Sequence, residues 1–158
     1  MTTQALSPQR PVVIVLAAGR GERFRAAGGQ TGKLEAMLAG RSVLAHVLDA
    51  VQRSGLDCHV VRPQHLAHTP GAGMGDSIAS GVGATADAVG WLILPGDLPL
   101  IRADTLRRVA DTLMALPPGQ ATVQPQYQGH RMSPLALVLR LHGGIPSPLR
   151  GGLVRLAG

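Results

Sequence analysis

The residues with the clearest chemical potential in this sequence lie in a segment rich in glycine and arginine that follows an apolar run. The run ends at Gly19, and Gly21, Arg23 and Lys33 come after it. Successive backbone N–H groups in such a loop can hold phosphate oxygens, and the basic side chains add charge for a triphosphate. A surface loop with solvated arginines is the alternative. The segment lacks the third glycine of a dinucleotide fingerprint, which argues against a dehydrogenase.

Lys33 stands out by its residue type. It is the only lysine in the chain, and the other 14 basic residues are arginines. A coding bias towards arginine accounts for those 14. A lysine kept against that bias indicates a position that uses a compact point charge rather than a planar guanidinium group. Chance survival of one lysine is the alternative.

A second segment, Gly73 to Ile78, places small residues at the start of a predicted helix. The free N–H groups of a helix N-terminus favour phosphate, Gly75 leaves room for a ligand, and Ser77 adds a hydroxyl group. The alternative is an ordinary helix start at which Asp76 or Ser77 is the cap.

The third segment, Leu94 to Leu100, places Asp97 at the carboxyl end of a predicted buried strand, directly after Gly96. A carboxylate at that edge of an α/β sheet faces the ligand-binding side rather than the core. Mg²⁺ takes oxygen ligands and commonly binds one or two carboxylates together with substrate phosphates. We therefore predict that Asp97 is a Mg²⁺ ligand, and the alternative is a turn or helix cap.

The elements that must position these segments alternate between strands and helices. Continuous apolar runs predict buried strands, and apolar residues with a helical period predict amphipathic helices. Strands are predicted at 11–19, 57–61, 90–97, 121–128 and 133–140, and helices at 43–51, 74–86 and 103–116. This order predicts one domain over residues 1–158 with a three-layer α/β/α, Rossmann-like architecture and a mostly parallel sheet. Residues 1–10 are expected to be flexible, and residues 132–158 are atypical.

Composition limits the classes of function. The formal net charge of +6 favours an anionic partner. The arginines are scattered and only three aromatic residues are present, so a small phosphorylated ligand is favoured over nucleic acid. The single cysteine, Cys58, excludes an internal disulfide and is expected to be buried. No apolar run reaches the length of a membrane span and no secretory signal is visible, so a cytoplasmic location is expected.

The three segments, in this order and spacing, resemble the MobA-like NTP transferase family, which includes molybdenum cofactor cytidylyltransferases and guanylyltransferases. They resemble that family's signature loop, its sugar- and base-contacting segment and its metal motif. The matching residues are Leu16-Ala17-Ala18-Gly19 with Arg23 and Lys33, then Gly75-Asp76-Ser77, then Gly96-Asp97-Leu98-Pro99. The resemblance covers about residues 11–130. Ala18 stands where guanylyltransferases usually carry glycine, so the sequence is more similar to the cytidylyltransferase branch.

The resemblance implies a fold like that of the nucleotide-diphospho-sugar transferases and a Mg²⁺-dependent reaction. A nucleotidyl group, CMP from CTP or GMP from GTP, would pass to a phosphorylated acceptor such as molybdopterin, with release of pyrophosphate. Asp97 would hold the metal, and Arg23 and Lys33 would neutralise phosphate charge. The nucleotide-binding residues implied are Leu16, Ala17, Ala18, Gly19, Arg20, Gly21, Arg23, Lys33, Gly75 and Ser77. No catalytic histidine is expected, because the acceptor phosphate is already ionised near neutral pH.

The sequence departs from the family pattern after residue 130. Met132-Ser133 stand where the family usually carries Gly-His, residues 112–158 contain no carboxylate, and residues 143–152 resemble no packed element. We expect a truncated or frameshifted carboxyl end, and a naturally short relative with a basic tail is the alternative. Such an end would expose a sheet edge, which could pair with a second copy as a homodimer.

Three functional hypotheses follow. The first is nucleotidyl transfer to molybdopterin, with a molybdoenzyme as a possible further partner. The second keeps the reaction but changes the acceptor to a sugar phosphate or another phosphorylated metabolite. The third is a non-catalytic module that binds nucleotide and releases no pyrophosphate.

Overall fold

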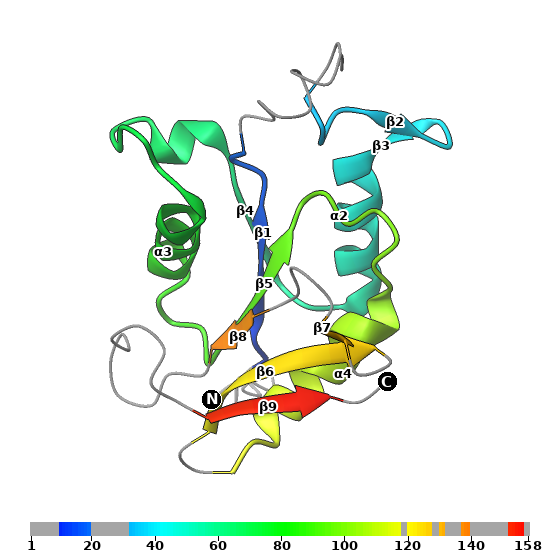
Figure 1. Cartoon of the computed structure of the whole chain (residues 1–158), viewed down its shortest axis with the longest axis vertical. Coiled ribbons are helices and arrows are strands. Elements are labelled where there is room, and N and C mark those ends of the chain that lie inside the picture. Colours follow the sequence, from blue (N-terminus) through cyan, green and yellow to red (C-terminus); the bar gives the residue numbers. More distant parts are fainter. Residues whose placement is uncertain are drawn as a thin grey trace, which may run out of the picture.

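The computed structural model describes residues 10–19, 32–117, 120–127, 130–131, 137–139 and 152–156. Within these ranges, helices cover both faces of one sheet (Figure 1). The helices are α2 (Val43–Ser54), α3 (Met74–Ala84) and α4 (Ala103–Met114), and a short 3-10 helix, η1, spans Pro63–Leu66. No helix of the described part is long and apolar enough to cross a membrane.

The main sheet has the strand order β4-β1-β5-β8-β6-β7 among the described residues, and β9 pairs with β6. Its strands are β1 (Val12–Leu16), β4 (Cys58–Val61), β5 (Trp91–Pro95), β6 (Gln120–Tyr127), β7 (His130–Arg131), β8 (Leu137–Leu139) and β9 (Gly152–Leu156). A separate hairpin contains β2 (Met37–Leu38) and β3 (Arg41–Ser42). β1 is parallel to both β4 and β5, whereas β8 is antiparallel to β5 and to β6.

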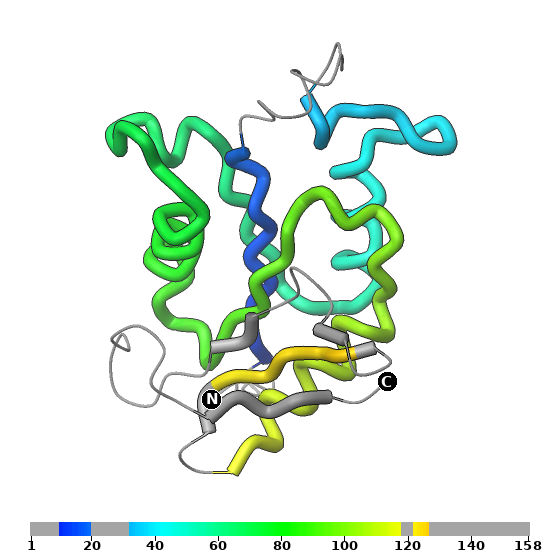
Figure 2. Tube along the Cα trace, in the orientation of Figure 1, coloured from blue at the N-terminus to red at the C-terminus, as the bar shows by residue number. Residues whose placement is uncertain are grey.

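Residues of β1 and β5 alternate between two hydrophobic cores. Val13, Val15 and their β5 partners pack with α2 and α4, while Ile14 and Ile93 pack on the side of α3. Figures 1 and 2 show α3 on one side of these strands and α2 and α4 on the other. Because both faces of β1 and β5 are covered, their sequences are continuously apolar rather than alternating. The predicted α/β/α architecture with its parallel centre is confirmed.

The ends of α2 follow from its sequence. The Ser42 hydroxyl oxygen accepts a hydrogen bond from the Ala45 amide at 3.1 Å, which satisfies one of the free N–H groups of the first turn. Gly55 ends the helix in the left-handed region, with φ at 72°, where a side chain would be strained. The predicted helix start at Ser42 is therefore confirmed.

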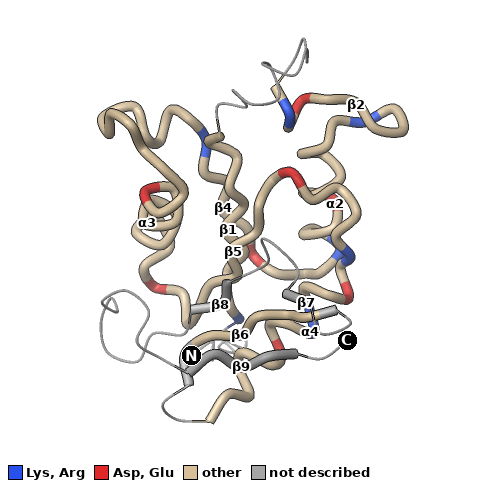
Figure 3. Tube along the Cα trace, viewed as in Figure 1, with Lys and Arg blue, Asp and Glu red and all other residues tan. Residues whose placement is uncertain are grey.

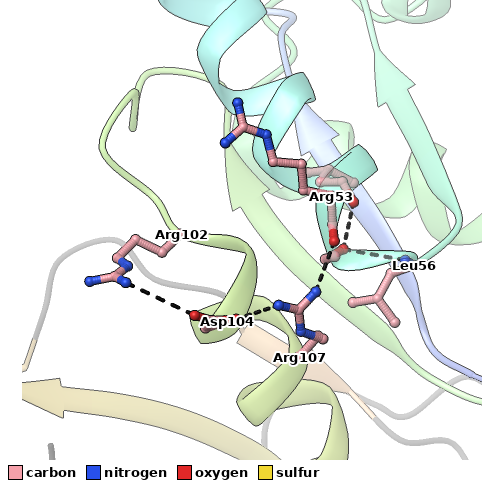
Figure 4. Close-up of polar contacts among 7 residues, drawn as sticks. Arg53, Leu56, Arg102, Asp104 and Arg107 are labelled. Atoms are coloured by element: carbon pink, nitrogen blue, oxygen red, sulfur yellow. Dashed lines mark hydrogen bonds and ion pairs between the residues drawn. The ribbon is translucent and has the colours of Figure 1, made fainter.

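Polar contacts attach the end of α2 to α4 (Figure 4). Arg107 on α4 donates a hydrogen bond to the Arg53 carbonyl oxygen at 2.8 Å, and its guanidinium group also pairs with Asp104. The Ser54 hydroxyl group donates to the Val51 carbonyl at 2.5 Å and accepts from the Leu56 amide at 3.3 Å. The bonds to the Arg53 and Val51 carbonyls satisfy groups that the last turn of a helix leaves without an internal partner.

Three expectations from the sequence need correction or lie outside the described residues. Cys58 is exposed on β4, an edge strand of the described sheet, and partial desolvation raises the pKa of its thiol. In the stretch 143–152, which was expected to resemble no packed element, residues 143–151 lie outside the described ranges, and Gly152 begins β9, which runs parallel to β6. Residues 1–9, 132–136 and 140–151 are outside the described ranges, as is most of the predicted strand 133–140.

Close packing of α3 on the sheet depends on Gly81, which is buried. A Cβ atom at this position would lie 2.5 Å from Ile14 Cγ2 and 3.1 Å from Val61 Cγ2. Both distances are shorter than ordinary van der Waals contact, so a larger residue would push the helix away from β1 and β4. The glycine thus sets the distance between these two layers.

We predict that Gly81→Ala lowers the free energy of unfolding by ~1–3 kcal/mol, the usual cost of overpacking a core. Gly83→Ala, two residues further along the same helix, is the matched control. A Cβ atom at Gly83 would meet nothing within 4 Å, so we expect this change to be neutral or to stabilise by up to about 1 kcal/mol. Urea unfolding of both variants tests the difference, and equal midpoints would contradict it.

Candidate functional site

Two predicted site residues that are distant in sequence are in direct contact. Lys33 Nζ lies 2.5 Å from Asp97 Oδ2, although 64 positions separate the two residues. Asp97 follows β5, and Lys33 precedes the β2–β3 hairpin. The contact therefore lies at the carboxyl end of a central strand, the edge at which open α/β sheets bind their ligands. The side chains are 55% and 29% exposed, respectively, so solvent and ligands can reach the pair.

The position of Asp97 depends on the glycine before it. The Gly96 amide donates a hydrogen bond to the Leu16 carbonyl at 3.0 Å and so joins the ends of β5 and β1. A Cβ atom at Gly96 would lie 2.9 Å from that oxygen and 3.3 Å from side-chain atoms of Leu34 and Leu44. Only glycine permits this approach without displacement of its neighbours.

The turn that contains Lys33 is held by the start of α2. The Val43 amide donates to the Ala36 carbonyl at 2.9 Å, and the Leu44 amide donates to the Leu34 carbonyl at 3.0 Å. These are N–H groups of the first helical turn, which need partners outside the helix. The backbone on either side of the Lys33–Asp97 pair is thus fixed by hydrogen bonds, one set from α2 and the other from β1.

The end of β1 contains the first predicted phosphate-binding residues. The Ala17 amide donates to the Val61 carbonyl at 2.8 Å, so this N–H group extends the pairing with β4. Leu16 and Ala18 are partly buried, and Gly19 is exposed. Among the predicted amide donors that the structure describes, Ala18 and Gly19 are therefore better placed than Ala17 to meet a phosphate group.

The predicted roles of Arg20, Gly21 and Arg23 stay predictions, because these residues lie outside the described ranges. None of the Lys, Arg, Asp and Glu residues that the structure describes belongs to β1, β4 or β5 (Figure 3). Among the described residues, Lys33 and Asp97 therefore form the ion pair that lies next to the carboxyl end of β5.

At the start of α3 the structure shows a helix cap. Asp76 Oδ2 accepts a hydrogen bond from the Gly73 amide at 2.7 Å. Ser77 is buried, and its hydroxyl group donates to the Gly73 carbonyl at 3.2 Å. Gly75 is exposed. A nucleotide contact through the Ser77 hydroxyl would therefore have to replace or share this internal bond, and the predicted role of Gly75 and Ser77 stays a prediction.

The donor set at Asp97 fits a metal ion that takes most of its ligands from phosphates and water. Among the described residues no group of three or more His, Cys, Asp or Glu side chains could hold a metal, which excludes a closed protein cage there. A single, accessible carboxylate matches the way Mg²⁺ binds beside substrate phosphates. The ion pair with Lys33 uses one carboxylate oxygen, Oδ2.

Sequence reasoning missed the apolar neighbours that align the site. Leu34 and Leu44 approach Gly96 from the Lys33 turn and from α2. Their signal was present in the sequence, since Leu34 is next to Lys33 and Leu44 begins the apolar face of the helix. Among the histidines, His46 contacts the Leu38 carbonyl at 2.7 Å and therefore supports the hairpin.

The fold is an α/β domain with the candidate site at the carboxyl ends of its central strands, and the family match identifies it as a nucleotidyltransferase-like domain. The chain matches the MobA-like NTP transferase domain family over residues 13–150 and belongs to that family. The match extends past residue 130, where the resemblance in the sequence was expected to end. The match therefore includes residues 132–150 of the stretch 132–158 that was marked as atypical.

Individual similarities agree with this assignment. The bifunctional protein GlmU of Xylella fastidiosa is 32% identical over 114 residues, which are 61% of this chain and 24% of that protein. The chain thus spans about a quarter of the length of the curated relatives it matches. The structure of Rv0371c from Mycobacterium tuberculosis has a TM-score of 0.66 at 23% identity, and the alignment covers 94% of this chain and 88% of that one.

A third similarity is to molybdopterin-guanine dinucleotide biosynthesis protein A from Archaeoglobus fulgidus. Its TM-score is 0.55 at 20% identity, and the alignment covers 92% of this chain and 83% of that chain. At this level of identity, both structural similarities establish a shared fold.

We predict that Gly96→Ala lowers the free energy of unfolding by ~1–3 kcal/mol, because the added methyl group meets a backbone oxygen that cannot move without disturbing β1. Asp97→Asn, at the next position, removes the ion pair and leaves the packing intact. For an exposed pair we expect a change of about 1 kcal/mol or less. Urea unfolding separates the two effects, and a larger loss in Asp97→Asn than in Gly96→Ala would contradict the interpretation.

Proposed function

We propose that this domain transfers CMP from CTP to a phosphorylated acceptor such as molybdopterin, with release of pyrophosphate and dependence on Mg²⁺ at Asp97. The observation that carries the proposal is the contact between Lys33 and Asp97 at the carboxyl end of β5, in a chain that belongs to the MobA-like NTP transferase family. A positive charge and a carboxylate that could bind a metal ion thus lie together near the end of β1, which supports the proposal.

In this proposal each residue acts on the charge of the triphosphate. Mg²⁺, held by Asp97, would neutralise phosphate oxygens and orient them. Lys33 would bind the phosphates as a point charge, and Arg23 would add a second positive charge. The Ala18 and Gly19 amides would donate hydrogen bonds to phosphate oxygens.

The chemistry requires no strong base. An oxygen of the acceptor phosphate attacks the α-phosphorus of CTP, and the bond from that phosphorus to the bridging oxygen breaks as pyrophosphate departs. The acceptor oxygen is already ionised near neutral pH, so no proton has to be removed. Catalysis then rests on positioning and on electrostatic stabilisation of the charge that builds on the leaving group.

The choice of CTP over GTP rests on Ala18, at the position where the guanylyl branch usually carries glycine. A methyl group there narrows the space at the end of β1, where residues near Leu16 would meet the base. The smaller pyrimidine ring fits that restriction better than a purine. GTP is the alternative nucleotide in this proposal.

A sugar phosphate is the second candidate acceptor. The chain is 32% identical to a GlmU protein and 20% identical to the molybdopterin-guanine dinucleotide protein, so sequence identity does not favour a molybdopterin acceptor over another phosphorylated compound. With molybdopterin as the acceptor, the proposal includes three further expectations. These are a molybdoenzyme that receives the product, a homodimer and a cytoplasmic location.

We predict that the purified protein releases pyrophosphate from CTP when both molybdopterin and Mg²⁺ are present. Asp97→Asn should reduce the rate at least about 100-fold, because the metal loses its protein ligand at the point where charge develops. A coupled pyrophosphate assay provides the measurement, with GTP and a sugar 1-phosphate as the alternative substrates. Faster release with either of these would reassign the base or the acceptor.

Asp111→Asn is the matched control, since it removes the same charge from an exposed position near the end of α4. It should retain the wild-type rate. Binding of CTP by calorimetry without any pyrophosphate release would favour the non-catalytic module instead.

A further inference from the structure

We propose that Lys33 and the divalent metal ion compete for the carboxylate of Asp97, and that a triphosphate relieves the competition by attracting Lys33. Nucleotide and metal would then bind with positive cooperativity, and metal alone would bind weakly. This inference rests on the proposed function, because it concerns the same carboxylate and the same nucleotide.

The first support is the contact itself. At 2.5 Å between Lys33 Nζ and Asp97 Oδ2, the ammonium group lies directly against one of the two carboxylate oxygens that a metal ion could use. Lys33 is the one ion-pair partner of Asp97 among the described residues. The carboxylate is therefore already neutralised by a cation of the protein, and an incoming metal ion has to displace that cation or share the carboxylate with it.

The second support is the contrast between a fixed backbone and a movable side chain. The Leu34 and Ala36 carbonyls hold the Lys33 turn on α2, and the Gly96 amide holds Asp97 on β1. Lysine has a flexible four-carbon stem with a rotatable ammonium group. Lys33 is 55% exposed, so it can swing away from Asp97 without any rearrangement of the main chain.

The third support is the balance of charge. When a metal ion displaces Lys33 in the absence of nucleotide, the ammonium group loses its ion-pair partner. The loss of that ion pair makes the net free energy of metal binding less favourable. A triphosphate supplies new partners for Lys33, so its presence removes that cost. By linkage, the factor by which nucleotide tightens metal binding equals the factor by which metal tightens nucleotide binding.

The test compares wild type with Lys33→Gln by titration with Mn²⁺ alone, with free Mn²⁺ counted by electron paramagnetic resonance. We expect Lys33→Gln to bind Mn²⁺ about two- to fivefold more tightly than wild type, the range that an accessible ion pair supports. The titration is then repeated with saturating CTP. With CTP bound, Lys33→Gln should bind Mn²⁺ no more tightly than wild type does. The triphosphate draws Lys33 away from Asp97 in wild type, and so removes the competing cation that the variant lacks.

Arg41→Gln is the matched control. Arg41 is a half-exposed cation eight positions after Lys33 that pairs with Asp49 on α2, so the same change in net charge occurs away from Asp97. It should leave Mn²⁺ affinity at the wild-type value. An equal increase in Arg41→Gln and Lys33→Gln would show that overall charge is responsible and would overturn the competition.

A second measurement uses the fact that Lys33 is the only lysine in the chain. Reductive methylation with a ¹³C reagent labels this side chain and the terminal amine for NMR. The signal that is missing in Lys33→Arg is then assigned to Lys33. Added Mg²⁺ should shift the lysine resonance of wild type towards its position in Asp97→Asn. No shift at Mg²⁺ concentrations that saturate Asp97 would overturn the proposal.

The outcomes separate this inference from the proposed function. If Asp97→Asn binds Mn²⁺ as well as wild type does, the metal assignment and the inference both fail. If Lys33→Gln binds Mn²⁺ no more tightly than wild type while pyrophosphate release is observed, the competition alone fails. Competition without pyrophosphate release contradicts the proposed reaction and supports the inference.

Discussion

The close approach of two strand ends determines the geometry of the site. Gly96 donates to the carbonyl of Leu16 at a separation that excludes a side chain, and this contact brings the chain after β5 against the end of β1. Asp97 is the next residue, so this hydrogen bond fixes the main chain from which its carboxylate reaches Lys33. The parallel pairing of β1 with β5 makes this approach possible, because it puts both carboxyl ends at the same edge.

Helix α2 contributes to the same junction from the other side. Its first amides hold the Lys33 turn, and Leu44 from its first turn packs towards Gly96 together with Leu34. The free N–H groups of a helix N-terminus need partners in any fold. Here those partners are the carbonyl groups of Leu34 and Ala36, which follow Lys33 in the same turn. The bonds that satisfy the helix N-terminus therefore also hold the turn that carries a candidate site residue.

The sequence predicted the layers and the parallel centre, because apolar runs and a serine cap encode the strands and helices. It also named Lys33 and Asp97 as site residues, but it did not predict their contact. It did not predict that Ala17 donates to β4 or that Ser77 bonds within its own helix, since these bonds depend on the register of strands and on a side-chain rotamer. Cys58 was expected to be buried because its neighbours are apolar, but β4 lies at the edge of the described sheet. Position in a sheet is a long-range property that a short apolar stretch does not encode. No strand was predicted at Gly152–Leu156, because this short segment forms a strand by pairing with β6, which is a long-range contact.

The residue type at position 33 is consistent with an exchangeable contact. An arginine facing Asp97 could form a planar, bidentate pair, whose two parallel hydrogen bonds resist displacement by a metal ion. Lysine offers a single ammonium group, here against one carboxylate oxygen, and its stem can redirect that group to a phosphate. In a chain whose other Lys or Arg residues are all arginine, the one lysine faces Asp97. Under the proposed competition, this is the position at which a cation would have to leave its carboxylate.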